Sequence, residues 1–348
     1  MKAEQRSMLE VMNATIKEEM ARDSRIIYMG ECVVGSAMGM TSGLYRQFGP
    51  SRVIETGLVE NTMVAAGIGL AQQGYRPIID PMMADFLTPA YAALTIAGKN
   101  RFMHGGKLDL PMVILTTMGG YLGLGAEHSG CPEAQVMHIP GLKLVIPSTI
   151  TDARGLLKTA IRDNNPVVYY FHKRLMREKG PVSDDDGAIP FGVADVKREG
   201  SDITVVATGY MVALCLDVAR KVAETGISVE VVDPRTLVPL DMETIVRSVK
   251  KTSRVVVVDE DYITCGVGGE IAMQIMEQAF DYLDGPIKRI GAKGWVPATS
   301  IDKLVLPTPQ EICDAITTLV GADRVPIEGI KPARLVEIKP AGDKPAQA

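Results

Sequence analysis

Residues 142–172 read LKLVIPSTITDARGLLKTAIRDNNPVVYYFH. Two short apolar runs, LKLVIPS (142–148) and PVVYYFH (166–172), flank TDARGLLKTAIRD (151–163), which we expect to be a helix. Short apolar runs of this kind are typical of strands that are buried in a parallel sheet. The stretch therefore predicts a strand–helix–strand unit, with Thr151 as a plausible N-cap of the helix.

The same alternation extends toward the N-terminus. An amphipathic pattern predicts a first helix over 7–21, and the Ala-, Gly- and Met-rich segment 61–71 predicts a tightly packed one. Four further runs predict strands: RIIYMGE (25–31), RVIETG (52–57), YRPIIDP (75–81) and PMVILTT (111–117). Repeated alternation of strand and helix indicates an α/β domain with a parallel sheet.

The second half repeats the alternation after a polar break at 177–192 that contains Gly, Pro and the acidic run 184–186. DITVVATG (202–209), ISVEVVDP (227–234) and RVVVVDED (254–261) predict strands, separated by helices over 211–225 and 242–251. This is the pattern of a small open βαβαβ domain. We therefore expect one domain over 1–180, a linker over 181–195, a second domain over 196–322 and a solvated tail over 323–348.

Composition excludes several classes of protein. The 348 residues carry 37 Lys and Arg against 42 Asp and Glu, a net charge of −5, which is a poor balance for binding nucleic acid through its phosphates. The five scattered cysteines form no CxxC pair, which argues against a disulfide framework and a zinc site. Neither a signal-peptide core nor an apolar run long enough to span a membrane is present. The expected location is the cytoplasm.

Two residues stand out as candidates for chemistry. His128 lies in the glycine-rich loop GGYLGLGAEHSG (119–130), which follows a strand end, where ligands of α/β proteins collect. An imidazole on such a loop is suited to donating protons near neutral pH. Glu60 lies at a strand-to-helix junction among apolar neighbours, where desolvation would raise the pKa of its carboxyl. The alternative for Glu60 is a carboxylate stabilised by the helix dipole.

GVGGE (266–270) also follows a strand and opens a helix, so its backbone could bind an anion. It is not a GxGxxG fingerprint, however, and we favour structural close packing.

Several long motifs, in this order, resemble one family. They are ETGLVENTMVAAGIGLAQQGYRPI, the stretch from GAEHSGCPEAQ to VVYYFHKR, VVDPRTLVPLDMETI and GVGGEIA. The family is the beta subunit of the thiamine-diphosphate-dependent component of 2-oxo acid dehydrogenase complexes, which includes pyruvate, branched-chain and acetoin enzymes. The resemblance covers about residues 5–320. It implies a pyrimidine-binding α/β domain followed by a smaller transketolase C-terminal domain.

The resemblance also implies roles for individual residues. Glu60 would contact the ring nitrogen of the aminopyrimidine of thiamine diphosphate and favour the tautomer that deprotonates the thiazolium carbon. Phe86 would pack on the pyrimidine, Leu58 would lie in the same wall, and Glu31 would lie near the cofactor. His128 would assist reductive acyl transfer to lipoamide. We therefore expect Glu60 and His128 to be catalytic.

In some relatives a structural loop binds a monovalent cation, usually K⁺. The matching positions here, expected to act mostly through backbone oxygens, are Met112, Ala160, Ile161, Asp163 and Asn165. The alternative for this turn is a helix C-terminus that Asn satisfies.

The family holds the diphosphate through Mg²⁺ and a GDG…N segment, and no GDG occurs in the 348 residues. The resemblance therefore implies a separate alpha subunit that holds Mg²⁺, in an assembly of two alpha and two beta chains, and a lipoyl-bearing acyltransferase as a further partner.

Two departures from the family bear on the substrate. Many relatives have a DQ…N helix after the aromatic, whereas this chain reads TPAYAALTIAGK (88–99), and Glu127 stands where Gln is usual. These differences put pyruvate in doubt and favour an acetoin-type acyloin or another 2-oxo acid. Half of a split transketolase, a non-catalytic scaffold and a nicotinamide-dependent dehydrogenase are the alternatives.

Overall fold

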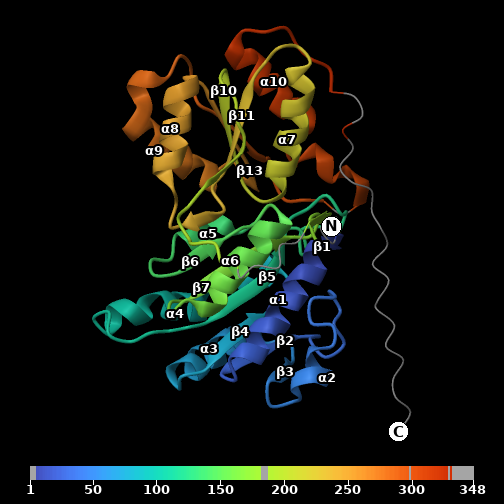
Figure 1. Cartoon of the computed structure of the whole chain (residues 1–348), viewed down its shortest axis with the longest axis vertical. Coiled ribbons are helices and arrows are strands. Elements are labelled where there is room, and N and C mark those ends of the chain that lie inside the picture. Colours follow the sequence, from blue (N-terminus) through green and yellow to red (C-terminus); the bar gives the residue numbers. More distant parts are fainter. Residues whose placement is uncertain (1–4, 182–186, 298, 328–329, 331–348) are drawn as a thin grey trace.

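The computed structural model describes residues 5–181, 187–297, 299–327 and 330. It contains two lobes, each built on a β-sheet with helices on both faces (Figure 1). Most of the tail expected over 323–348, and part of the expected linker, lie outside the described residues. Within the described part of the chain, no helix combines the length and the apolar composition that crossing a membrane requires.

The first lobe contains a seven-stranded sheet in the order β12-β6-β7-β5-β4-β2-β3. Six of its strands are mutually parallel: β2 (Ile26–Glu31), β3 (Val53–Thr56), β4 (Arg76–Asp80), β5 (Val113–Met118), β6 (Lys143–Val145) and β7 (Val167–His172). Each overlaps an apolar run that predicted a strand. The seventh strand, β12 (Thr236–Val238), comes from the second half of the chain and pairs antiparallel with β6. The α/β parallel-sheet prediction is thus confirmed.

The helices of this lobe lie on the two faces of the sheet. Helices α1 (Met8–Arg22) and α6 (Ile150–Arg162) pack together on one face, and α3 (Glu60–Gln72) and α4 (Tyr91–Met103) on the other. The connections contain the shorter helices α2 (Leu44–Phe48), η1 (Ala84–Leu87) and α5 (Glu133–Met137). Two short strands, β1 (Gln5–Ser7) and β8 (Lys179–Pro181), form a separate antiparallel pair.

The N-cap prediction for α6 was wrong by two residues. Thr149 has extended dihedral angles, and its hydroxyl accepts a hydrogen bond from the backbone N–H of Asp152 at 3.1 Å. Thr151 already lies inside the helix, so its backbone cannot take the extended conformation that an N-cap requires.

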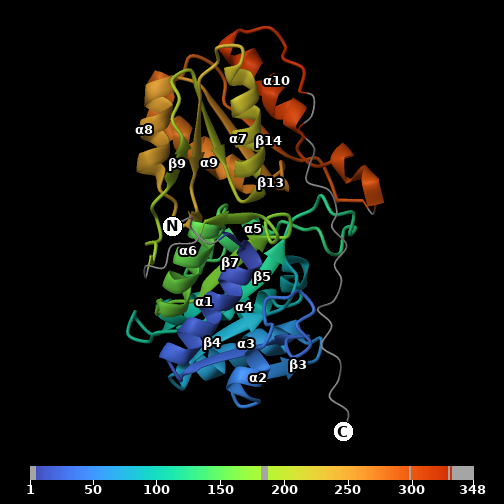
Figure 2. The same ribbon diagram turned by 45° about the vertical axis from the view of Figure 1, so that its right-hand side comes forward.

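The second lobe contains a five-stranded sheet in the order β14-β13-β10-β11-β9. Its strands are β9 (Asp195–Arg198), β10 (Ile203–Ala207), β11 (Val229–Asp233), β13 (Val255–Tyr262) and β14 (Lys288–Ala292), with only β9 antiparallel to its neighbour. The three predicted strands are present, and β9 and β14 extend the sheet at its edges. Helices α7 (Tyr210–Ala223) and α10 (Pro309–Val320) cover one face, and α8 (Met242–Thr252) and α9 (Val267–Ala279) cover the other (Figure 2). The 3₁₀ turns are η2 (Phe280–Tyr282) and η3 (Thr299–Leu304).

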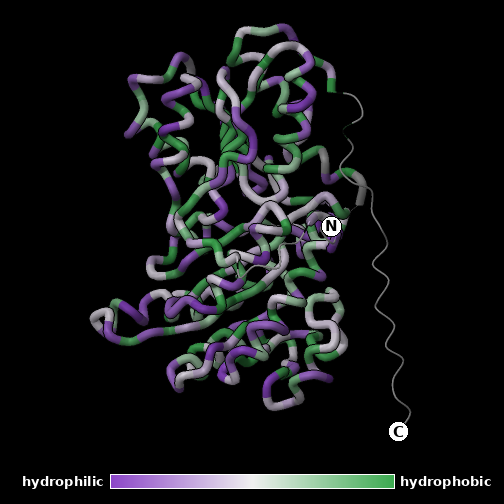
Figure 3. The backbone as a smooth tube through the Cα atoms, in the orientation of Figure 1, coloured by the Kyte–Doolittle hydropathy of each residue, from purple (hydrophilic) through white to green (hydrophobic). Residues whose placement is uncertain are grey.

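Two apolar layers run through both lobes. One contains Tyr169 from β7 together with Tyr210 from α7, and the other contains Tyr170 from β7 together with Met242 from α8. Hydrophobic residues accordingly follow the strands of both sheets (Figure 3). The two lobes therefore bury apolar surface against each other as well as within themselves.

Polar groups join the lobes where the carboxyl ends of the two sheets meet. The hydroxyl of Ser148, after β6, donates to the carboxylate of Asp233 at the end of β11 at 2.5 Å. Lys197 pairs with Asp152 at 2.5 Å, and Arg235 pairs with the same carboxylate at 2.8 Å. Ligands of α/β proteins bind at carboxyl ends of parallel strands, so this junction is where a site is expected.

Close packing explains the first glycine of GVGGE. A Cβ at Gly266 would lie 2.0 Å from the carbonyl oxygen of Tyr262, which no side chain could tolerate. The residue stands directly before α9, so it lets that helix begin against the end of β13. The packing interpretation accounts for this glycine without a bound anion.

Candidate active site

The carboxyl edge of the first sheet brings acidic side chains together. Glu31 is the last residue of β2, and Asp80 is the last residue of the neighbouring β4. Gly30 pairs with Asp80 in the ladder, and a Cβ at Gly30 would lie 2.3 Å from the carbonyl oxygen of Asp80. Only glycine allows the two strands to approach this closely, so the sequence of β2 fixes the spacing between the two acids.

Glu31 is the desolvated carboxyl of this edge. Its side chain is buried, and neither carboxyl oxygen has a hydrogen-bond partner among the described residues. Burial, with the nearby charges of Glu60 and Asp80, raises its pKa from 4.5 to about 7. A carboxyl in this state retains a proton near neutral pH and can donate it in a hydrogen bond to a ligand.

Asp80 is fixed by two donors. The hydroxyl of Tyr28 donates to one carboxylate oxygen at 2.6 Å, and the backbone N–H of Met82 donates to the other at 2.9 Å. Burial raises the pKa of Asp80 to about 6, although both hydrogen bonds act to lower it. Asp80 therefore contributes a negative charge close to Glu31, which helps to raise the pKa of Glu31.

The structure places Glu60 at the first position of α3, where its side chain is half-buried. Its apolar neighbours Leu58 and Val59 are 73% and 45% exposed, so they do not enclose it as the sequence had suggested. The carboxyl that burial desolvates here is that of Glu31. Glu60 is nevertheless close enough for its charge to raise the pKa of Glu31, so the two predicted acids share one site.

The predicted aromatic and histidine also meet. Phe86, in η1, and His128, in the loop between β5 and α5, are both half-buried, and their ring centroids lie 5.6 Å apart in an edge-to-face arrangement. The backbone N–H of Gly130 donates to both carboxylate oxygens of Asp85, the residue before Phe86, at 3.0 and 3.1 Å. The segment that carries Phe86 thus holds the loop that carries His128. Glu127 is exposed beside it.

Sequence reasoning missed four residues of this region: Asp80, Asp85, His172 at the end of β7, and Glu260 near the end of β13, whose carboxylate lies 2.7 Å from the His172 ring. All four lie at strand ends or next to a residue that was predicted. The rule that ligands gather at carboxyl ends of parallel strands would have identified Asp80, His172 and Glu260. Asp85 carries no such signal, because its importance depends on a loop that is distant in sequence.

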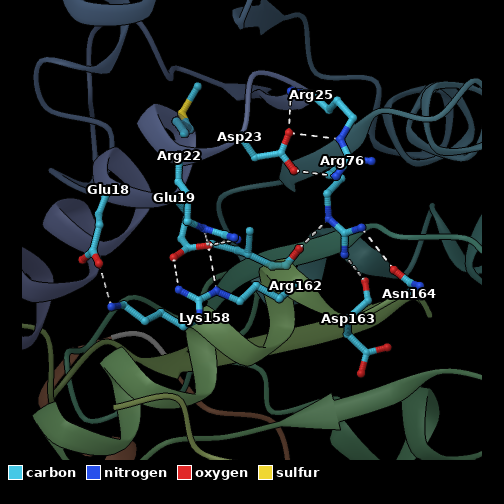
Figure 4. A network of polar contacts seen from close by, with 12 residues as sticks. Glu18, Glu19, Arg22, Asp23, Arg25, Arg76, Lys158, Arg162, Asp163 and Asn164 are labelled. Atoms are coloured by element: carbon cyan, nitrogen blue, oxygen red, sulfur yellow. Dashed lines mark hydrogen bonds and ion pairs between the residues drawn. The ribbon is translucent and has the colours of Figure 1, made fainter. Parts of the chain in front are cut away.

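The five positions expected to bind a monovalent cation surround the turn that follows α6. There the guanidinium of Arg76 donates to the carbonyl oxygens of Ile161 at 2.9 Å and Asp163 at 2.5 Å, and to the side-chain oxygen of Asn164 at 3.1 Å. Figure 4 shows this guanidinium reaching from β4 to the turn. Two of the expected carbonyl ligands therefore already accept hydrogen bonds from a cationic side chain.

Further basic groups face the same turn. Lys143 pairs with the carboxylate of Asp163, and Arg101 donates to the side-chain oxygen of Asn165 at 2.7 Å. In the described ranges no group of three or more His, Cys, Asp or Glu side chains is arranged to hold a metal ion. Each of these carbonyl oxygens has a second lone pair that is available to a cation beside Arg76. The monovalent cation site therefore stays a prediction.

Comparison with known proteins agrees with this architecture. The family described as transketolase, pyrimidine binding domain, matches residues 4–179, and the family described as transketolase, C-terminal domain, matches residues 192–312. A solved structure, a split gene transketolase in an inactive beta4 tetramer, superposes with a TM-score of 0.73 over 91% of this chain and 99% of that one, at 22% identity. The family matches and the fold thus define a transketolase-like protein of the thiamine-diphosphate-binding class.

Curated relatives narrow this class. The 2-oxoisovalerate dehydrogenase subunit beta of Bacillus subtilis is 40% identical over 90% of this chain and 98% of its own length. The acetoin:2,6-dichlorophenolindophenol oxidoreductase subunit beta of the same organism is 38% identical, over 90% and 97%. The pyruvate dehydrogenase E1 component subunit beta of Rickettsia felis is 39% identical, over 88% and 96%. The chain belongs to this family of dehydrogenase beta subunits.

Proposed function

We propose that the chain is the beta half of an enzyme that decarboxylates a 2-oxo acid, or cleaves an acyloin, and transfers the acyl group to lipoamide. The observation that carries the proposal is the convergence of Glu31 and Glu60 at one sheet edge, in the same lobe as the contact between Phe86 and His128. These four residues come from separate segments of the sequence, and the resemblance assigned all of them to one site.

The residues fit thiamine diphosphate. Both carboxyl oxygens of Glu31 are buried and have no hydrogen-bond partner among the described residues, so they are free to bind a ligand. Glu60 is accessible at the start of α3. Leu58 exposes an apolar surface beside Glu60, and Phe86 presents a half-buried ring. We propose that Glu60 binds the aminopyrimidine nitrogen, while Phe86 and Leu58 contact the ring.

When bound, thiamine diphosphate supplies the electron sink for cleavage of the carbon–carbon bond. Glu60 would hydrogen-bond the ring nitrogen, and the protonated Glu31 keeps a second negative charge away from the cofactor. Leu58 and Phe86 exclude water from one side of the ring. The chain itself thereby sets the protonation and orientation on which the chemistry depends.

His128 acts in the transfer to lipoamide. The two electrons released from the substrate reduce the lipoyl disulfide, so that one sulfur takes the acyl group and the other leaves as a thiolate that requires a proton. An imidazole titrates near neutral pH and can supply this proton. The edge contact with Phe86 holds the His128 ring beside that aromatic.

We further propose that an alpha subunit completes the site and holds Mg²⁺ with the diphosphate, in an assembly of two alpha and two beta chains. The designation "subunit beta" of the relatives supports this arrangement. A lipoyl-bearing acyltransferase would accept the acyl group. Among substrates we favour an acetoin-type acyloin, or a 2-oxo acid other than pyruvate, because of Glu127 and the segment 88–99.

Calorimetry with thiamine diphosphate and Mg²⁺ tests the proposal, using this chain alone and then the chain co-purified with the alpha subunit. We expect binding only by the pair, and its loss in Glu60→Ala. Glu270→Ala is the matched control, because Glu270 is also an acid in the first turn of a helix but lies in the second lobe. Tight binding by the isolated chain, or unchanged binding by Glu60→Ala, would overturn the shared site.

The competent assembly is then offered 2-oxoisovalerate, pyruvate and acetoin, with lipoamide as acceptor. Acyl transfer from one of them supports the proposed reaction. Transfer of a two-carbon unit to an aldose without lipoamide would instead identify a split transketolase.

A further inference from the structure

The segment that carries His128 is closed at its base. We refer to residues 119–130 as the His128 loop. The backbone N–H of Gly119 donates to the carbonyl oxygen of Gly130 at 3.1 Å, so the two ends of the loop lie side by side. The orientation of His128 therefore depends on how this base is fixed.

A residue of the second lobe fixes one end of this loop. Glu260, near the end of β13, accepts a hydrogen bond from the backbone N–H of Gly120 at 2.5 Å through one carboxylate oxygen. Its other oxygen lies 2.7 Å from Nε2 of His172 at the end of β7. Both side chains are buried. A single carboxylate thus joins the first residues of the His128 loop to the second lobe.

The second ring nitrogen determines the direction of this hydrogen bond. Nδ1 of His172 accepts the backbone N–H of Arg174 at 3.0 Å, so the proton of a neutral imidazole lies on Nε2 and points at Glu260. Burial acts to raise the pKa of Glu260, but His172 and the Gly120 N–H hold it below its ordinary value. Glu260 therefore stays an acceptor for both groups.

The glycines at the start of the loop leave no space between these partners. A Cβ at Gly119 would lie 1.8 Å from Nε2 of His172, and a Cβ at Gly120 would lie 2.6 Å from Leu306. The next residue, Tyr121, donates its hydroxyl to the carbonyl oxygen of Pro307 at 2.7 Å. The second lobe thus contacts two successive residues of the loop through side chains and backbone.

Asp85, the residue before Phe86, fixes the other end of the loop. Asp85 accepts the N–H of Gly130 with both oxygens, and a Cβ at Gly130 would lie 2.3 Å from Oδ1 of Asp85. Asp85 and Glu260 also share a charge partner, because both act on the buried ammonium group of Lys173. Both carboxylates therefore act on the same charge at the base of the loop.

We propose that Glu260 and Asp85 are positioning residues that fasten the two ends of the His128 loop, so that the second lobe sets the orientation of His128 toward the acyl acceptor. This inference rests on the proposed role of His128 in acyl transfer. A displacement of a reacting group by about 1 Å can cost roughly a hundredfold in rate. Removing the contacts of either carboxylate with the loop is expected to lower the rate of acyl transfer at least about tenfold.

The test uses the co-purified alpha and beta assembly with Glu260→Gln. Two activities are compared with the same substrate: acylation of a lipoylated domain and reduction of 2,6-dichlorophenolindophenol, which needs no lipoyl group. We expect the ratio of the first to the second to fall about tenfold, through kcat rather than the KM for the lipoylated domain. Asp85→Asn is expected to lower the same ratio.

Glu230→Gln is the matched control. Glu230 is also buried, pairs with a basic side chain and accepts a glycine N–H, that of Gly200 at 3.2 Å, but it lies on β11 away from the His128 loop. It should leave the ratio unchanged. A fall of both activities together in Glu260→Gln, with an unchanged ratio, would overturn the positioning role.

Hydrogen exchange of residues 119–130 provides a readout that does not depend on activity. Glu260→Gln should speed exchange at the loop by at least about tenfold while leaving β5 protected.

His128→Gln distinguishes the two proposals. If His128→Gln retains full acyl transfer, the proposed role of His128 is wrong. Hydrogen exchange of the loop then still tests whether Glu260 and Asp85 fasten its two ends. If His128→Gln abolishes transfer but neither Glu260→Gln nor Asp85→Asn changes the ratio or the exchange, the positioning role fails alone. Asp85→Asn serves where Glu260→Gln does not fold.

Discussion

Replacing Glu31 by Gln should stabilise the isolated chain at alkaline pH. In the folded protein, burial raises the pKa of this carboxyl from 4.5 to about 7, whereas in the unfolded chain it keeps its ordinary value. The folded state therefore binds a proton more tightly than the unfolded state between these two pH values. Stability falls as pH rises across this window, because the folded protein must then ionise a buried carboxyl.

The structure sets the magnitude. Since a tenfold change in proton affinity corresponds to about 1.4 kcal/mol, a rise from 4.5 to about 7 corresponds to roughly 3 kcal/mol. Gln has the shape of the protonated acid and does not ionise. Glu31→Gln should therefore match the wild type near pH 4.5 and exceed its free energy of unfolding by about 2–3 kcal/mol at pH 8.

Urea denaturation of both proteins from pH 4.5 to pH 8 measures this difference. The contributions of Asp80 and Asp261, whose pKa values burial also raises, are present in both proteins and largely cancel. Glu55→Gln is the control, because Glu55 is an exposed acid on the adjacent strand β3, and it should retain the wild-type dependence on pH. A parallel pair of stability curves for the wild type and Glu31→Gln would refute the reasoning.

Four further predictions concern other parts of the chain. Replacing Na⁺ by K⁺ should raise the melting temperature if the turn after α6 binds the ion, by the equivalent of about 2.7 kcal/mol at 100 times the dissociation constant; equal melting curves would show that the turn binds no K⁺ beside Arg76. Arg76→Met should cost about 3 kcal/mol in urea denaturation, and Arg76→Lys should recover little, since a single ammonium cannot reproduce the fork of three contacts. Leu58→Ala should change stability by less than about 0.5 kcal/mol, because the side chain is 73% exposed, yet weaken thiamine diphosphate binding by the assembly in calorimetry. Gly119→Ala should destabilise by about 3–5 kcal/mol in thermal melts, since its φ of +93° and the close approach of His172 both exclude a side chain.

The strands could be predicted from sequence because their signal is local. RIIYMGE and PVVYYFH are apolar between their end residues, and β2 and β7 are buried along their whole length. The pairing of β12 with β6 could not be predicted, because the two strands are far apart in sequence and each has only three residues. The N-cap of α6 was missed because two threonines compete there and only backbone conformation separates them.

The sequence predicted candidate residues that the structure brings together in two pairs, Glu31 with Glu60 and Phe86 with His128, but it did not predict their electrostatics. Glu60 was expected to be desolvated because Leu58 and Val59 are apolar, but those side chains point outward. Glu31 is desolvated by burial in the folded chain, which its own segment does not reveal. The hydrogen bonds of Asp85 and Glu260 with the His128 loop depend on contacts between distant segments, which no periodicity encodes.

The strand β12 has a consequence for dissecting this protein. It supplies the outer edge of the first sheet, where Thr236 pairs with Val145 and Val238 pairs with Leu144. A fragment that ends at residue 181 would lose this cover and present β6, with its apolar side chains, as an open edge for intermolecular pairing. Sequence families divide the chain into two modules, but the unit that must be expressed and engineered intact is both together.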